Sequence, residues 1–166
     1  MSDLALLHDP DPAIAALARD LERARAPSYP LTFEARRLAA PPSEPSATLD
    51  ALASEAGYTG LGAYWVAIPR RIAAKILVHI IGGELAYPAE IVRHDQAEEL
   101  AARFLALFAE GAHYFTNGAV SGEFAIYDSD GGDVLGWRSL SAAPYDNGVI
   151  ALGAARVALL WAEDAP

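Results

Sequence analysis

The spacing of apolar residues changes along the chain, and this change most restricts the folds that the chain can adopt. Over residues 11–26, 46–56 and 95–110, apolar side chains recur at the three- and four-residue intervals of a helix. From residue 123 onward they fall in short runs separated by Gly, Asp and Asn, as in strands joined by tight turns. Strands that follow one another in sequence usually pair. We therefore predict an α+β fold, with N-terminal helices packed on one face of a C-terminal antiparallel β-meander.

Capping residues indicate where the first two helices begin and end. Asp11 can accept a hydrogen bond from the first turn of a helix, and Pro12 suits the first helical position. Ser46 or Thr48 would cap the second helix, and Gly57 would end it. These signals predict two helices before residue 60.

The helix predicted over residues 95–110 has a signal at each end. Asp95 and Glu98 have the spacing of a capping box, in which two side chains satisfy the free amides at a helix start. Gly111 would close the helix, because glycine adopts the backbone conformation that a helix end often needs.

Two segments fit more than one structure. Residues 31–38 alternate like a strand, although their composition suits a helix as well. Residues 70–81 are rich in β-branched side chains, which favours a strand, whereas Arg71, Lys75 and His79 recur like the polar stripe of a helix. We predict a helix for 70–81 and leave 31–38 open between helix and strand.

Short apolar runs predict the strands of the sheet. Residues 63–68 form one run, and residues 123–127 and 134–140 would form a hairpin. A second hairpin would join residues 149–152 to residues 156–161. If this last strand lies at a sheet edge, it could pair with a second copy of the chain.

The length of the chain, 166 residues, predicts a single domain that spans 1–166. Residues 40–47 contain three prolines and indicate a loop or a semi-rigid connector. Residues 1–45 could therefore be an N-terminal helical extension, but the piece is too short for us to expect a separate domain.

The composition excludes several classes of function. The absence of cysteine excludes a disulfide scaffold, a thiolate zinc site and a cysteine nucleophile. A net charge of −10 would repel phosphate backbones, so we expect no nucleic-acid partner. No apolar run reaches the length of a membrane span and the N-terminus lacks a basic region, which predicts a cytoplasmic protein with no membrane partner. No nucleotide-binding or metalloprotease motif occurs, so no cofactor is expected.

Three aspartates in one predicted turn, Asp128, Asp130 and Asp133, are the candidate metal ligands. Calcium binds several carboxylate oxygens, but Gly132 stands where the EF-hand loop needs a ligand. Aspartate and glycine are also the ordinary residues of a solvated hairpin turn. We therefore expect no bound metal.

His113 begins a polar and aromatic run between the predicted helix and sheet. Loops on a rigid frame often carry function. His113 as an acid or base, with Tyr114 or Asn117 as its hydrogen-bond partner, is the candidate catalytic group. No nucleophile stands at a diagnostic spacing, so a capping or turn role is the alternative.

Paired arginines are candidates for binding a carboxylate or a phosphate. Of the pairs Arg36–Arg37 and Arg70–Arg71, the second is better placed. It would begin a helix, where free amides also attract anions. Ion pairing with the abundant acidic residues is the alternative.

A cluster of Trp137, Arg138, Tyr145 and Asp146 is the second candidate binding surface. Tryptophan, tyrosine and arginine are common at the energetic centres of protein interfaces. The alternative places Trp137 in the core and residues 145–148 in a turn.

These observations lead to three hypotheses. The first is a non-catalytic, acidic protein-interaction domain that binds a basic partner, as a bacterial immunity protein or antitoxin does, through Trp137 and its neighbours. The second is a small enzyme or a small-molecule-binding protein with a pocket around His113. The third is an accessory domain that forms a homodimer through its last strand. Because no catalytic motif occurs, the sequence favours the first.

Overall fold

The structure is a computed structural model, and it describes residues 5–25, 31–83, 90–118, 140–141 and 145–164. The strands are β1 (Leu6–His8), β2 (Leu31–Leu38), β3 (Val66–Ile68), β4 (His113–Thr116), β5 (Tyr145–Leu152) and β6 (Arg156–Asp164). The helices are α1 (Pro12–Ala24), α2 (Pro45–Glu55), α3 (Arg70–Gly82) and α4 (His94–Leu105), with the 3-10 helix η1 (Gly62–Tyr64).

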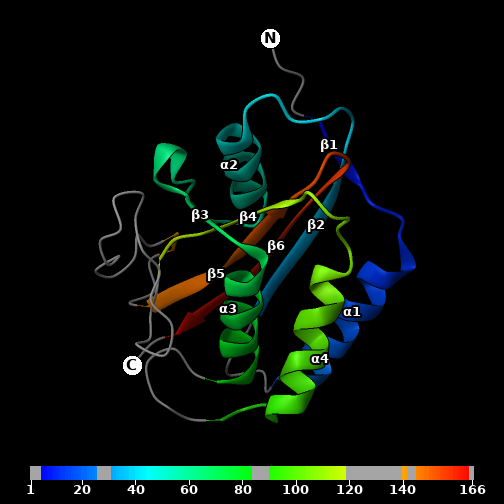
Figure 1. Cartoon of the computed structure of the whole chain (residues 1–166), viewed down its shortest axis with the longest axis vertical. Coiled ribbons are helices and arrows are strands. Elements are labelled where there is room, and N and C mark those ends of the chain that lie inside the picture. Colours follow the sequence, from blue (N-terminus) through cyan, green and yellow to red (C-terminus); the bar gives the residue numbers. More distant parts are fainter. Residues whose placement is uncertain (1–4, 26–30, 84–89, 119–139, 142–144, 165–166) are drawn as a thin grey trace.

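The six described strands form one antiparallel sheet in the order β1-β2-β6-β5-β4-β3. Helices α1, α4 and α3 lie side by side on one face, and α2 covers the other (Figure 1). The α+β class is therefore confirmed. The predicted arrangement is wrong in part, because strands and helices interleave along the chain and helices cover both faces.

Two hydrophobic cores fill the spaces between the three layers. On the face of α1, α3 and α4, residues such as Ile76 and Phe104 pack on Leu160. On the face of α2, Leu49 and Leu52 pack with alternate residues of β5 and β6. The two cores meet at β6, whose side chains from Val157 to Ala162 are all buried. A strand that is apolar on both sides needs a cover on each.

The two segments that fit both helix and strand in the sequence take different structures. Residues 31–38 form strand β2, which pairs with β6 from the far end of the chain. Residues 70–82 form helix α3, which confirms the prediction for 70–81. The carbonyls at the end of α3 accept hydrogen bonds from Arg25 Nη1, at 2.8 Å from Ile80 and 3.0 Å from Ile81. A buried guanidinium thus caps α3 and ties it to the residue after α1.

The predicted cap of the first helix is confirmed, and the cap of the second is wrong. The Asp11 carboxylate accepts a hydrogen bond of 2.9 Å from the Ala13 amide. Helix α2 begins at Pro45, so Ser46 and Thr48 lie inside it and cannot cap it. Proline is suited to the first helical position, and its place there moves the start of the helix back.

The ends of the helix predicted over 95–110 are also corrected. Helix α4 begins at His94 with Arg93 before it, and Asp95 lies in the first turn instead of capping it. The helix ends at Leu105, because the amides of Leu107 and Phe108 bond to carbonyls three residues back and leave the helical path.

The predicted strands have mixed outcomes. The hairpin of 149–152 and 156–161 is confirmed and is longer, since residues 145–148 belong to β5 and not to a turn. Within residues 63–68, only Val66–Ile68 form a strand. The predicted hairpin of 123–127 and 134–140 lies outside the described residues except for Leu140, which is buried in a bend. Strand β6 is paired on both sides, so it is not an edge at which a second copy could add.

No helix in the described part of the chain is both long enough and apolar enough to cross a membrane.

Trp161 packs directly over Gly148. They face each other across β5 and β6, and the indole lies where a side chain at position 148 would be. A Cβ there would lie 2.5 Å from Trp161 Cε3 and would overlap the carbonyl oxygen of Leu160. The indole also packs at right angles to Trp65, with ring centroids 6.1 Å apart. Glycine at position 148 is thus what admits Trp161 to the core.

We predict that Gly148→Ala lowers the free energy of unfolding by about 2 kcal/mol or more, because overpacking forces the strand or the indole to move. Gly153→Ala is the matched control, since its Cβ would meet nothing closer than 3.4 Å. Urea unfolding of both variants measures the difference. Equal stability of the two variants would contradict this account of Gly148.

Candidate functional site

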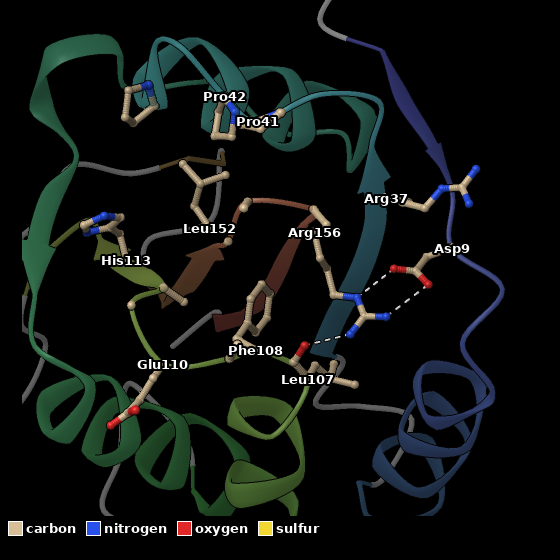
Figure 2. Close-up of a pocket in the computed structure, with 17 residues that line it drawn as sticks. Asp9, Arg37, Pro41, Pro42, Leu107, Phe108, Glu110, His113, Leu152 and Arg156 are labelled. Carbon is tan, nitrogen blue, oxygen red and sulfur yellow. Dashed lines mark hydrogen bonds and ion pairs between the residues drawn. The ribbon is translucent and has the colours of Figure 1, made fainter.

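An open pocket of about 690 Å³ lies at the end of the sheet where β5 turns into β6. Its walls come from separate parts of the chain: the turn 153–155, the loop 107–112 between α4 and β4, and the proline-rich segment 41–45 (Figure 2). The amide of Gly153 donates to the carbonyl of Arg156 at 2.8 Å and keeps the turn tight. The pocket therefore sits over a rigid hairpin end.

The centre of the pocket is apolar. Leu152 rises from the end of β5, and the Phe108 ring faces it from the loop below (Figure 2). Pro41 and Pro42 close the opposite side. Proline rings fix the backbone and leave no amide to satisfy, so this wall is rigid and suits apolar contact.

Arg156, the first residue of β6, holds one end of the pocket together. Its Nε and Nη2 donate to the two oxygens of Asp9, at 2.7 and 3.2 Å. Nη2 also donates to Asp11 Oδ2 at 2.9 Å, and Nη1 donates to the carbonyl of Leu107 at 2.7 Å. One guanidinium thus joins β6, the residues before α1 and the loop after α4.

The charges in this cluster stabilise one another. The hydrogen bonds from Arg156 hold the pKa of the Asp9 carboxyl below its ordinary value, against the opposing effect of burial. The nearby guanidinium of Arg37 acts in the same direction. In return, the Asp9 carboxylate raises the pKa of Arg156. Asp9 is 5% exposed as a side chain, so the pair is largely desolvated.

Of the three candidate catalytic residues, only His113 lies exposed beside the large pocket (Figure 2). Tyr114 is the next residue of β4, so its side chain points to the other face of the sheet, where it is buried in the core of α3 and α4. Asn117 is buried as well, and its amide donates to Asp146 Oδ1 at 2.9 Å. The structure does not bring the three together as a catalytic group.

Asp146 is buried at the opposite end of the β5–β6 hairpin. Its carboxylate accepts hydrogen bonds from the amide of Leu140, from the amide and hydroxyl of Ser141, and from the indole of Trp161 at 3.1 Å. With Asn117, these donors surround both oxygens. Asp146 thus has a structural role, while its predicted part in binding stays a prediction.

Trp137 and Arg138 of the predicted interaction surface lie outside the described residues. The candidate metal ligands Asp128, Asp130 and Asp133 lie outside them as well. Tyr145 is the first residue of β5.

A second pocket, of about 550 Å³, lies on the other side of the loop 108–113. It is lined by that loop together with Tyr114 and the residues that lead into α3, Ile68, Pro69 and Arg70. Arg70 Nη1 lies 3.3 Å from the Tyr114 hydroxyl, to which it donates. Arg71 is exposed on the same turn of α3 and does not line the pocket.

Sequence reasoning found His113 and Arg70 but missed most of the site. The prolines of 41–45 were interpreted as a connector, although they form a wall. Arg156 and Asp9 carried no signal, because they are 147 residues apart and meet only in the fold. Phe108 was assigned to the apolar face of a helix, whereas it follows the helix end and faces the pocket.

Neither metal geometry nor known proteins identify a ligand. Among the residues that the structure describes, no group of three or more His, Asp or Glu side chains could hold a metal ion. No family model, no curated protein and no solved structure matches the chain. The geometry of the two pockets is therefore what indicates a function for the chain.

We predict that Asp9→Asn lowers the free energy of unfolding at pH 7 by about 2 kcal/mol, because it removes a charged acceptor from a partly buried guanidinium. The loss should depend on pH. Since the pKa of Asp9 is lowered by folding, its contribution is complete above the ordinary aspartate value of about 3.9. It disappears as the pH falls through the lower pKa of the folded state.

Urea unfolding at pH 7, at pH 5 and in steps below pH 4 measures this difference between wild type and Asp9→Asn. Asp95→Asn is the control, because that carboxylate is 76% exposed and its ion pair is screened by water. A difference for Asp9→Asn that stays constant down to pH 2 would show that the carboxylate charge is not what stabilises the cluster.

Proposed function

We propose that this chain is a small-molecule-binding protein whose ligand occupies the large pocket beside His113. The observation that carries the proposal is the pocket itself, an apolar hollow with rigid walls from separate segments. Its volume of about 690 Å³ lies within the range of about 300–1,000 Å³ that is usual for ligand sites. Polar groups stand at its rim, where they would orient a ligand.

The lining favours a ligand with an apolar body. The prolines and the small exposed parts of Leu152 and Phe108 offer dispersion contacts to a ligand. At one end, the charge of Arg156 is already balanced by Asp9 and Asp11, so this guanidinium has little left to attract an anion. Binding would then be driven mainly by removal of apolar surface from water.

Binding is favoured over catalysis by the surroundings of His113. A general acid or base must be held in a defined orientation beside the reacting group. Within the described residues, no hydrogen bond fixes the exposed imidazole, and Tyr114 and Asn117 lie elsewhere. The pocket therefore supplies a place for a ligand without a positioned catalytic pair.

The acidic protein-interaction domain stays a prediction. Most of its residues lie outside the described part of the chain, and nothing in the described part favours it over the pocket.

We expect octan-1-ol to bind in the large pocket. Burial of about six methylene groups at roughly 0.8 kcal/mol each corresponds to a dissociation constant on the order of 0.3 mM. Two-dimensional NMR of the amides measures it, and the largest shifts should fall on Phe108, His113 and Leu152. Shifts confined to other parts of the chain, or none at millimolar octan-1-ol, would contradict the proposal.

A pocket-filling variant provides the test by mutation. Ala154 is an exposed residue of the turn that lines the pocket, so Ala154→Phe should occupy the hollow without disturbing the core. We expect it to weaken octan-1-ol binding about tenfold or more. Ala102→Phe, on the exposed side of α4 and outside both pockets, should bind as wild type does. Equal weakening by both variants would mean that the pocket is not the site.

A further inference from the structure

The two pockets share one wall, the loop from Phe108 to His113. Three residues of this wall are small: Ala109, Gly111 and Ala112. Because this loop lines both pockets, a ligand that lay across it would occupy both.

Each pocket is lined by an arginine that forms no ion pair with a described residue, Arg37 in the large pocket and Arg70 in the second. Arg71 and Lys75 lie exposed on α3 and do not line the second pocket. The chain has 22 acidic and 12 basic residues, so basic side chains have many possible partners. Ion pairs are formed among the described residues by Arg23, Arg36, Arg93, Arg103 and Arg156. Arg70, Arg71 and Lys75 form none with any described residue, and neither do Arg19 and Arg37. Of these residues, Arg70 lines the second pocket, so its charge is available to a ligand there.

Arg70 is held in place for such a role. Its guanidinium donates to the Tyr114 hydroxyl at 3.3 Å, and Tyr114 is itself 5% exposed and fixed in the core. The remaining N–H groups of the guanidinium are unused by any described carboxylate. A planar guanidinium that is held in place and has free N–H groups can bind a carboxylate or a phosphate through two hydrogen bonds. Glu110 also lines the pocket and opposes an anion, so its carboxylate offsets part of the attraction of Arg70.

We infer that the second pocket binds the anionic head of the ligand, so that the chain recognises an amphipathic anion, with its apolar body in the large pocket and a carboxylate or phosphate at Arg70. This inference rests on the proposed function, since it extends the same ligand across the loop. It adds the class of ligand, which the large pocket by itself leaves open.

Three probes with the same alkyl chain test the inference: octan-1-ol, octanoate and octylamine. In low salt, we expect octanoate to bind about fivefold more tightly than octan-1-ol, and octylamine to bind more weakly than either. Titration calorimetry and the amide shifts of Arg70 and Tyr114 measure this. Octyl phosphate is compared with octanoate, and the tighter of the two identifies which head the pocket prefers.

Two substitutions at the second pocket should act in opposite directions. Arg70→Gln should reduce octanoate affinity to about that of octan-1-ol, because it removes the charge that faces the head. Glu110→Gln should raise octanoate affinity about twofold, because it removes the opposing charge. A variant that merely damaged the fold would weaken both probes and would not strengthen either. Arg93→Gln, an exposed arginine outside both pockets, is the control and should change neither affinity.

The outcomes separate the two proposals. If octan-1-ol and octanoate bind the large pocket with equal affinity and Arg70→Gln changes neither, the anionic subsite is wrong and the small-molecule-binding function stands. If neither probe binds, the proposed function fails and the subsite fails with it. If octanoate binds more tightly and the preference is lost in Arg70→Gln, the inference is supported.

Discussion

The structure depends on the burial of β6 on both faces and along both edges. Its apolar run from Val157 to Ala162 cannot be left on a surface, and its backbone is paired with β2 on one side and β5 on the other. A strand of this kind requires a neighbour on each edge and a helical layer on each face. Strands β2 and β5, from distant parts of the chain, are the neighbours along the two edges. Helix α2 covers one face, and α1, α3 and α4 cover the other.

The large pocket follows from the way in which β6 begins. Arg156 enters the sheet with a full charge beside a buried core, and a charge there is tolerated only when it is paired and hydrogen-bonded. Asp9, Asp11 and the carbonyl of Leu107 supply those partners. In doing so they draw the residues before α1 and the loop after α4 to the end of the hairpin. The pairing of the Arg156 charge thus positions these walls of the pocket.

Local signals predicted the parts of the fold that depend on neighbouring residues. The spacing of Arg71, Lys75 and His79 correctly indicated α3, and the turn at residues 153–155 correctly indicated the last hairpin. What the sequence left open depends on distant contacts. Residues 31–38 alternate like a strand and also suit a helix, and their pairing with β6 decides between the two.

The site was predictable to a still smaller extent, because its residues have no common motif. His113 was found from its polar surroundings and Arg70 from its place at a helix start. The walls come from residues 9, 41–45, 107–113 and 152–156, which share no spacing that a sequence could display. A pocket assembled in this way appears only when the topology is known.

The two ends of the β5–β6 hairpin differ in what they can offer to a partner. At one end, the buried carboxylate of Asp146 is surrounded by donors from Asn117, Leu140, Ser141 and Trp161. A ligand that bonded to it would have to displace one of these donors and leave it unsatisfied in the interior, which is unfavourable. At the other end, apolar surface is open and Arg70 keeps donors that no described acid uses. Recognition at the turn thus gains new contacts without breaking old ones, and for that reason we place the ligand there.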